Sequence, residues 1–161
     1  GIYQFGLRDL VIIKAVSPTE YRSVGPAVAV RAVELQLARG WGDAEQTRQH
    51  KWRWATAQHA TMIITNSGEQ PLEVRLAFRA RSLAPRSFKI SVGGRSLWAS
   101  NWLRRPRQIT PASFLALPGD TTIELATTGE PTSPSVEHDQ SRLTFLVEDL
   151  QVIVSWPKAN P

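Results

Sequence analysis

The strict alternation of residues 72–80, "LEVRLAFRA", constrains the fold more than any other stretch of this chain. Leu72, Val74, Leu76, Phe78 and Ala80 fall on one side of an extended segment, and the residues between them include one glutamate and two arginines. A period of two is that of a β-strand with one face buried and the other in water. The segment therefore predicts a half-buried strand in a sheet.

Similar alternation and frequent turn residues recur along the rest of the chain. In "RSFKISVGGRSLWAS" the alternation runs on both sides of Gly93 and Gly94, which supply the positive φ angles of a tight hairpin. Further strands are predicted at 10–16, 28–37, 51–57, 60–66, 108–117, 121–127 and 142–155. About nine short strands between Gly and Pro turns indicate an all-β domain, an antiparallel two-sheet β-sandwich that is jelly-roll-like.

Two stretches depart from simple alternation. The segment 29–40, "AVRAVELQLARG", favours a strand, with a helix ending at Gly40 as the alternative because its Ala, Leu, Glu and Arg are good helix formers. In the last strand the apolar residues change parity between Val147 and Leu150. A β-bulge near 148–149 would restore a single buried face.

Length and composition indicate one folded domain. The chain has 161 residues, 42% of them hydrophobic and 20% charged, no cysteine and a net charge of +5, which favours an anionic partner. We expect an N-terminal segment at 1–39 whose strands pack on the sandwich, the sandwich itself at 40–156, and a tail at 157–161. There is no signal peptide and no apolar run of about 18 residues for a transmembrane segment, and the start "GIYQFGLRDL" suggests a piece of a longer protein.

Motifs for catalysis are lacking. The sequence has no phosphate loop, dinucleotide fingerprint, HExxH or GxSxG. His50, His59 and His138 are too scattered to predict a metal site, and His138 beside Asp139 is better interpreted as part of a solvated loop than as a base. Calcium at turn aspartates is an alternative to ordinary turn hydrogen bonding for Asp43, Asp120 and Asp149. We therefore expect no enzymatic activity, no cofactor and no metal.

Tryptophans are the best candidates for binding. Trp52 and Trp54 share one face of a predicted strand, with Lys51 and Arg53 on the other. The central position of Trp54 predicts burial in the core, whereas Trp52 is expected to be partly exposed together with Trp41 or Trp102. The predicted glycan-binding residues are Trp41, Trp52, Trp102, Lys51 and Gln58.

Arginines form two groups. Arg75, Arg79 and Arg81 project from the outer face of the central strand, as does Lys89 from its neighbour, and Arg104, Arg105 and Arg107 cluster beside Trp102. A solvated face that prevents edge aggregation is the simplest interpretation. Contact with an anionic membrane surface or an acidic glycan is the alternative. Because no nucleic-acid fingerprint accompanies these arginines, nucleic acid is not an expected partner.

One further indication comes from a run of strand and turn motifs. The run is "GWGD", "KWRWATAQHATMIITNSGEQPLEVRLAFRARSLAPRSFKISVGGRSLWAS", "FLALPGDTTIELATTGE" and "RLTFLVEDLQV", within roughly 40–153. It resembles the C-terminal β-domain of bacterial multi-spanning membrane glycosyltransferases, seen in variant form in membrane phosphoglycerol transferases.

The resemblance implies a non-catalytic accessory domain on the extracytoplasmic side of a bacterial membrane. Such a domain would position or recognise an envelope glycan or lipid-linked sugar, and the transferase chemistry would lie in a membrane region outside this chain. The alternatives are a free-standing carbohydrate-binding module and a purely structural domain that packs on its own membrane region.

Overall fold

The computed structural model describes residues 3–8, 11–15, 33–102, 105–133, 142–155 and 157. These residues form 13 β-strands in two sheets. The eight-stranded sheet contains β1 (Tyr3–Arg8), β2 (Val11–Ala15), β4 (Trp41–Gln46), β5 (Lys51–Ala55), β7 (Leu72–Ser82), β10 (Arg107–Ile109), β11 (Phe114–Ala116) and β13 (Phe145–Ser155). The five-stranded sheet contains β3 (Val33–Leu37), β6 (His59–Asn66), β8 (Arg86–Val92), β9 (Arg95–Trp102) and β12 (Gly119–Thr127).

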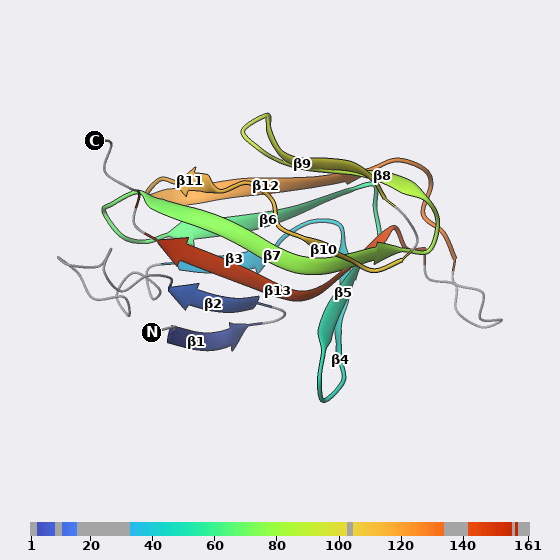
Figure 1. Ribbon diagram of the computed structural model, residues 1–161, viewed down its shortest axis with the longest axis horizontal. Coiled ribbons are helices and arrows are strands. Elements are labelled where there is room, and N and C mark those ends of the chain that lie inside the picture. The colour runs from blue at the N-terminus through green and yellow to red at the C-terminus, as the bar shows by residue number, and fades with distance from the viewer. Residues whose placement is uncertain are drawn as a thin grey trace.

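The two sheets stack as a sandwich (Figure 1), which confirms the predicted all-β, two-sheet class. Strand pairs are antiparallel except for β2 with β13. The described strands outnumber the predicted nine or so because β1 and β4 were not anticipated and because 108–117 is two strands. Pro111 lies between β10 and β11, where it cannot donate a ladder hydrogen bond.

The segment 29–40 is a strand in its described part. In β3 the side chains alternate between buried and exposed, and β3 pairs with β6 at one edge of the five-stranded sheet. Val33, Leu35 and Leu37 belong to the hydrophobic core. The core therefore includes residues that precede the predicted sandwich boundary at residue 40.

Strand β13 organises the eight-stranded sheet. One of its edges pairs along its length with β7, whose far edge carries β10 and β11. The other edge is shared: β5 pairs with 146–148 and β2 pairs with 151–154. Because β2 occupies the second half of this edge, the β4–β5 hairpin leaves the sheet there and projects from the body of the sandwich (Figure 1).

The change of partner on β13 coincides with the predicted β-bulge. The register with β7 shifts between Glu148 and Gln151, and Asp149 has a φ of 52°. As a result Val147 and Leu150 are both fully buried on the inner face. The tight hairpin between β8 and β9 is also confirmed, with Gly93 and Gly94 at φ angles of 57° and 78°.

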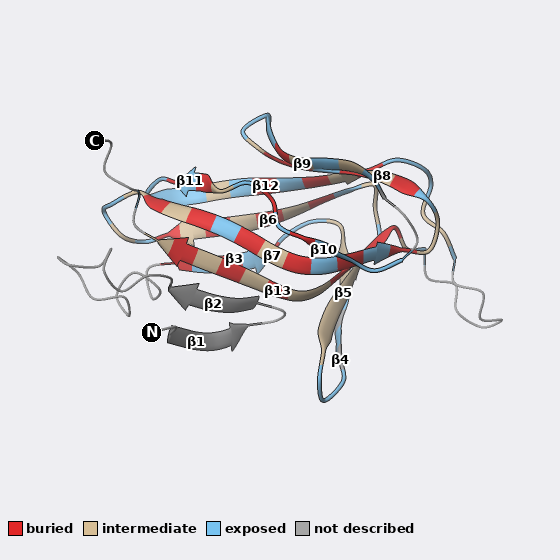
Figure 2. Cartoon of the chain, in the orientation of Figure 1, coloured by how far each residue is buried: buried red, intermediate tan, exposed pale blue. Residues whose placement is uncertain are grey.

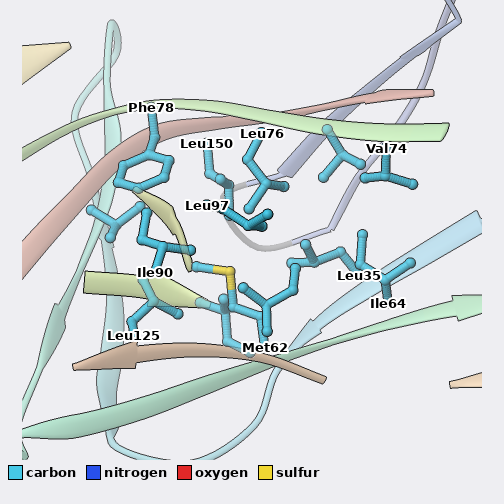
Figure 3. Packing of buried hydrophobic residues seen from close by; sticks show 14 of the residues in the cluster. Leu35, Met62, Ile64, Val74, Leu76, Phe78, Ile90, Leu97, Leu125 and Leu150 are labelled. Carbon is cyan, nitrogen blue, oxygen red and sulfur yellow. The ribbon is translucent and has the colours of Figure 1, made fainter. Parts of the chain in front are cut away.

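The core lies between the two sheets. Figure 3 shows side chains of the eight-stranded sheet facing those of the five-stranded sheet, with Leu76, Phe78 and Leu150 opposite Met62 and Ile90. The alternation in β7 is the one read from the sequence, since every second residue from Leu72 to Ser82 is buried. Colouring by burial shows the same banding along β7 and β13 (Figure 2).

One arginine is buried at an end of the sandwich. Arg86 is 4% exposed at the start of β8, and its guanidinium donates five hydrogen bonds of 2.7–3.0 Å. The acceptors are Ser82 Oγ, the carbonyls of Thr128, Gly129 and Glu130, and Thr132 Oγ1. Burial lowers the pKa of Arg86 and nearby Glu130 opposes this, but an arginine stays protonated. Arg86 thus anchors the segment 128–132 to the sandwich.

Candidate functional site

The burial of Ala55 shows which side chains of β5 point to the core and which point outward. This residue is fully buried in the core, so successive residues of the strand alternate between the core side and the outer face. Trp54 and Trp52 therefore point to the outer face of the eight-stranded sheet. Both side chains are half-buried.

Cross-strand pairing sets the neighbours of these two tryptophans. Trp54 lies in a row with Leu146 of β13 and Arg81 of β7. Trp52 lies in the next row, with Glu148 and Arg79. The outer face near the projecting hairpin therefore combines two indole rings with two guanidinium groups and a carboxylate.

The prediction that Trp54 is buried in the core is wrong. The Arg81 guanidinium carbon lies 5.6 Å from the centroid of the Trp54 ring, a cation–π contact on the outer face. Leu146, between them in the row, is only 4% exposed although it does not belong to the core cluster. Position within the strand suggested burial, but the parity set by Ala55 decides the face.

Trp52 is partly exposed, as expected, and its ring is oriented by a hydrogen bond. The indole Nε1–H donates to Glu45 Oε2 at 2.9 Å, across the β4–β5 pair. This bond ties down the polar edge of the indole and leaves the ring faces to other contacts. Glu45 lies in β4, a strand that is not among those predicted from the sequence, so the partner of Trp52 was not foreseen.

Next to Trp52 lies a cluster of three titratable side chains. His50 Nδ1 is 2.8 Å from Asp149 Oδ2 and 3.1 Å from Glu148 Oε1. The other oxygen of Asp149 accepts the backbone N–H of Lys51 at 3.2 Å. The sequence interpretation of His50 as an isolated histidine is corrected by this geometry. The predicted bulge was a usable signal, because bulges often lie next to functional sites.

No other predicted glycan-binding residue with a described side chain lies beside Trp52 on the outer face. Trp41 packs against the core, where its Nε1–H donates to the Thr61 carbonyl at 2.9 Å and its ring meets Phe145 edge-on at 5.6 Å. Gln58 Nε2 donates to the Gly129 carbonyl at 3.1 Å. Lys51 adjoins Trp52 in β5, but its side chain has the opposite parity. The side chain of Trp102 lies outside the described residues.

The arginines that were predicted to face solvent are exposed wherever the structure describes their side chains. Arg75, Arg79 and Arg81 lie on the outer face of β7, and Arg105 and Arg107 are exposed near β10. The guanidinium carbon of Arg107 lies over the half-buried ring of Trp98, 5.8 Å from its centroid. Lys89 is exposed too, but on β8 of the other sheet, and Arg104 lies outside the described residues.

The remaining titratable candidates that the structure describes are not brought together. Asp120 accepts a hydrogen bond from Thr65 Oγ1 at 2.6 Å, which fits the structural interpretation of that residue. Asp43 is exposed in β4 and His59 is exposed at the start of β6. His138 lies outside the described residues.

Comparison with known families adds no assignment. No protein-family model matches the chain, and no curated protein matches it. Solved structures with a similar arrangement include a Podospora anserina GH26-CBM35 β-(1,4)-mannanase, with 12% identity, a TM-score of 0.46, and coverage of 80% of this chain and 29% of that one. A Bacillus thuringiensis Cry1Da tryptic core variant has 13% identity and a TM-score of 0.44, covering 76% and 22%.

The chain thus spans less than a third of each of these two proteins. A carbohydrate-binding module CBM36 in complex with calcium and xylotriose has 14% identity and a TM-score of 0.37, covering 76% of this chain and 99% of that one.

Proposed function

We propose that this chain is a non-catalytic module that binds a glycan on the outer face of its eight-stranded sheet. The observation that carries the proposal is the outward direction of Trp52 and Trp54, two large aromatic side chains placed where they are not needed for the core. Tryptophans held on a surface are characteristic of recognition sites, because the face of the indole ring is apolar and its N–H can be fixed by a hydrogen bond.

The groups around the tryptophans suit the hydroxyls of a sugar. A pyranose presents C–H groups on its faces, which stack on an indole ring, and hydroxyls at its rim. Carboxylates accept hydrogen bonds from hydroxyls and guanidinium groups donate to them. Glu148 and Arg79 lie in the same cross-strand row as Trp52 and can provide both kinds of contact.

Trp52→Ala is expected to weaken glycan binding by roughly 10-fold or more, because truncating an aromatic anchor removes about 2 kcal/mol or more of binding energy. The thermal midpoint should change little, since the Trp52 ring lies outside the core cluster. Screening on a glycan array identifies a ligand, and calorimetry with that ligand measures the affinity of each variant.

Lys89→Ala is the matched control, because this exposed side chain lies on the other sheet.

Trp54→Ala should weaken binding as well, by removing the stack with Arg81. Unchanged affinity in both tryptophan variants would rule out this face as the binding surface. Equal loss of thermal stability in both would assign the rings to packing.

The larger setting of the module is a proposal that rests on the resemblance described above. In that setting the module serves a bacterial membrane glycosyltransferase from the extracytoplasmic side and positions an envelope glycan or lipid-linked sugar. The described part of the chain contains no helix that is long and apolar enough to cross a membrane. Reading the genomic sequence upstream of the codon for Gly1 tests this setting, which fails if no multi-spanning region is encoded there.

The exposed arginines of β7 favour a second candidate, contact with an anionic membrane surface. Arg75, Arg79 and Arg81 all face outward from one strand. Sedimentation with vesicles should rise with the fraction of anionic lipid and fall with salt, because the Debye length shrinks to about 8 Å at physiological ionic strength. The triple variant with glutamine at these positions should not sediment. Binding to neutral vesicles to the same extent would contradict an electrostatic contact.

A further inference from the structure

The cluster at the bulge of β13 has the donor set of a metal site. His50 Nδ1 and one carboxylate oxygen each from Glu148 and Asp149 lie within 4.8 Å of one another. We propose that these three side chains bind one divalent transition-metal ion of the Zn²⁺ class. The proposal does not rest on glycan binding, because metal binding has its own readout, although the Glu148 carboxylate takes part in both.

The ligands are held in place before any ion arrives. Asp149 is fixed by its position in the bulge and by the Lys51 N–H, which engages the carboxylate oxygen that faces away from His50. The backbone N–H of His50 donates to Thr47 Oγ1 at 3.1 Å, within the turn of the β4–β5 hairpin. A second contact on a ligating carboxylate, such as that of the Lys51 N–H on Asp149, orients the ligand and raises metal affinity. Little conformational entropy therefore remains to be lost when an ion binds.

The electrostatics also favour a cation between these groups. A single imidazole nitrogen faces two carboxylates, at 2.8 and 3.1 Å, and can offer them at most one shared proton. A divalent ion provides two positive charges at the same place. The lone pair of His50 Nδ1 coordinates the ion, and any proton on that nitrogen passes to solvent.

The donor types discriminate between classes of metal. Calcium prefers six to eight oxygen ligands, and this cluster offers two carboxylates and a nitrogen. Imidazole suits Zn²⁺ and its transition-metal neighbours, which bind at about 2.0–2.2 Å to nitrogen and carboxylate oxygen with three protein ligands and an open position. The three donor atoms lie within 4.8 Å of one another, so one ion can reach all three once the side chains adjust around it.

Calorimetric titration of ZnCl₂ into the untagged chain tests the proposal. We expect one ion per chain and a rise of the thermal midpoint that saturates with it, because an ion that binds only the folded state stabilises that state. A parallel titration with CaCl₂ should show much weaker binding. Absence of stoichiometric zinc binding, or calcium binding at least as tight, would overturn the proposal.

Three variants locate the ion. His50→Ala should lower zinc affinity by more than about 10-fold, since loss even of an outer contact costs about 10- to 100-fold. Asp149→Asn should do the same while keeping the bulge, because asparagine also tolerates a positive φ. His59→Ala, which removes an exposed histidine of β6, should leave zinc binding unchanged. Full zinc affinity in the first two variants, or its loss in the third, would place the ion elsewhere.

Discussion

Phe145→Ala is expected to lower the free energy of unfolding by about 3 to 5 kcal/mol, the usual loss for a large aromatic residue removed from a packed core. Phe145 is 0% exposed at the start of β13. The centroid of its ring lies 5.6 Å from that of Trp41, in an edge-on contact, and 5.2 Å from that of Phe88, in a tilted one. The truncation therefore leaves a cavity between the two sheets. Urea unfolding followed by tryptophan fluorescence measures the change.

Leu115→Ala is the control for this prediction. Leu115 is 48% exposed on β11, so its truncation removes apolar atoms without opening a cavity. Its effect should stay within about 0.5 kcal/mol, which is typical of surface substitutions. A Phe145 variant as stable as the Leu115 variant would show that the aromatic cluster does not hold the sheets together.

Arg86→Met should cost about 3 kcal/mol or more, although methionine can fill most of the volume of the arginine stem. The cost comes from the acceptors left behind: three carbonyls and two hydroxyls lose a charged donor. Each buried polar group without a partner costs about 1–3 kcal/mol, reduced where water can reach it. Urea unfolding measures the loss.

Arg95→Met is the matched control, because Arg95 is exposed and its hydrogen bond within the described part of the chain is a long one, 3.4 Å from Nη2 to the Ser113 carbonyl oxygen. Arg86→Lys should recover only part of the stability, since an ammonium has three donors on a single nitrogen and cannot reproduce the planar fork. If Arg86→Met were as stable as Arg95→Met, the segment 128–132 would be held by other contacts.

Features fixed by local sequence were predictable. The Gly93–Gly94 hairpin follows from two residues that accept positive φ, and the β13 bulge follows from a parity change between Val147 and Leu150. Strand β4 was missed because "GWGD", with its two glycines and an aspartate, is typical of a turn. In the structure the turn residue is Gly40, with a φ of 85°, and the strand begins at the next residue. A Cβ at Gly40 would lie 2.4 Å from the His59 carbonyl oxygen, so this position requires glycine.

The candidate site was harder to predict because it depends on which strands become neighbours. Trp52 and Trp54 were correctly placed on one face, but that this face is the outer one depends on Ala55 entering the core. His50 and Asp149 are 99 residues apart in sequence and meet only because β5 pairs with β13. No local pattern records that pairing, so the cluster could not be found from spacing.

The sharing of one edge of β13 between β5 and β2 affects which part of the sheet can move. Strands inside a sheet exchange their amide hydrogens only through rare, extensive opening, whereas segments with few packed neighbours open locally at low free-energy cost. β6, β12 and β8 are successive neighbours in their sheet. Among the described strands, by contrast, β4 pairs only with β5, and β5 pairs with β13 only as far as Glu148. The end of the hairpin beyond the Trp52–Glu148 pair can therefore open as on a hinge while the sandwich stays folded. An ion held between His50 and the bulge would lock that hinge.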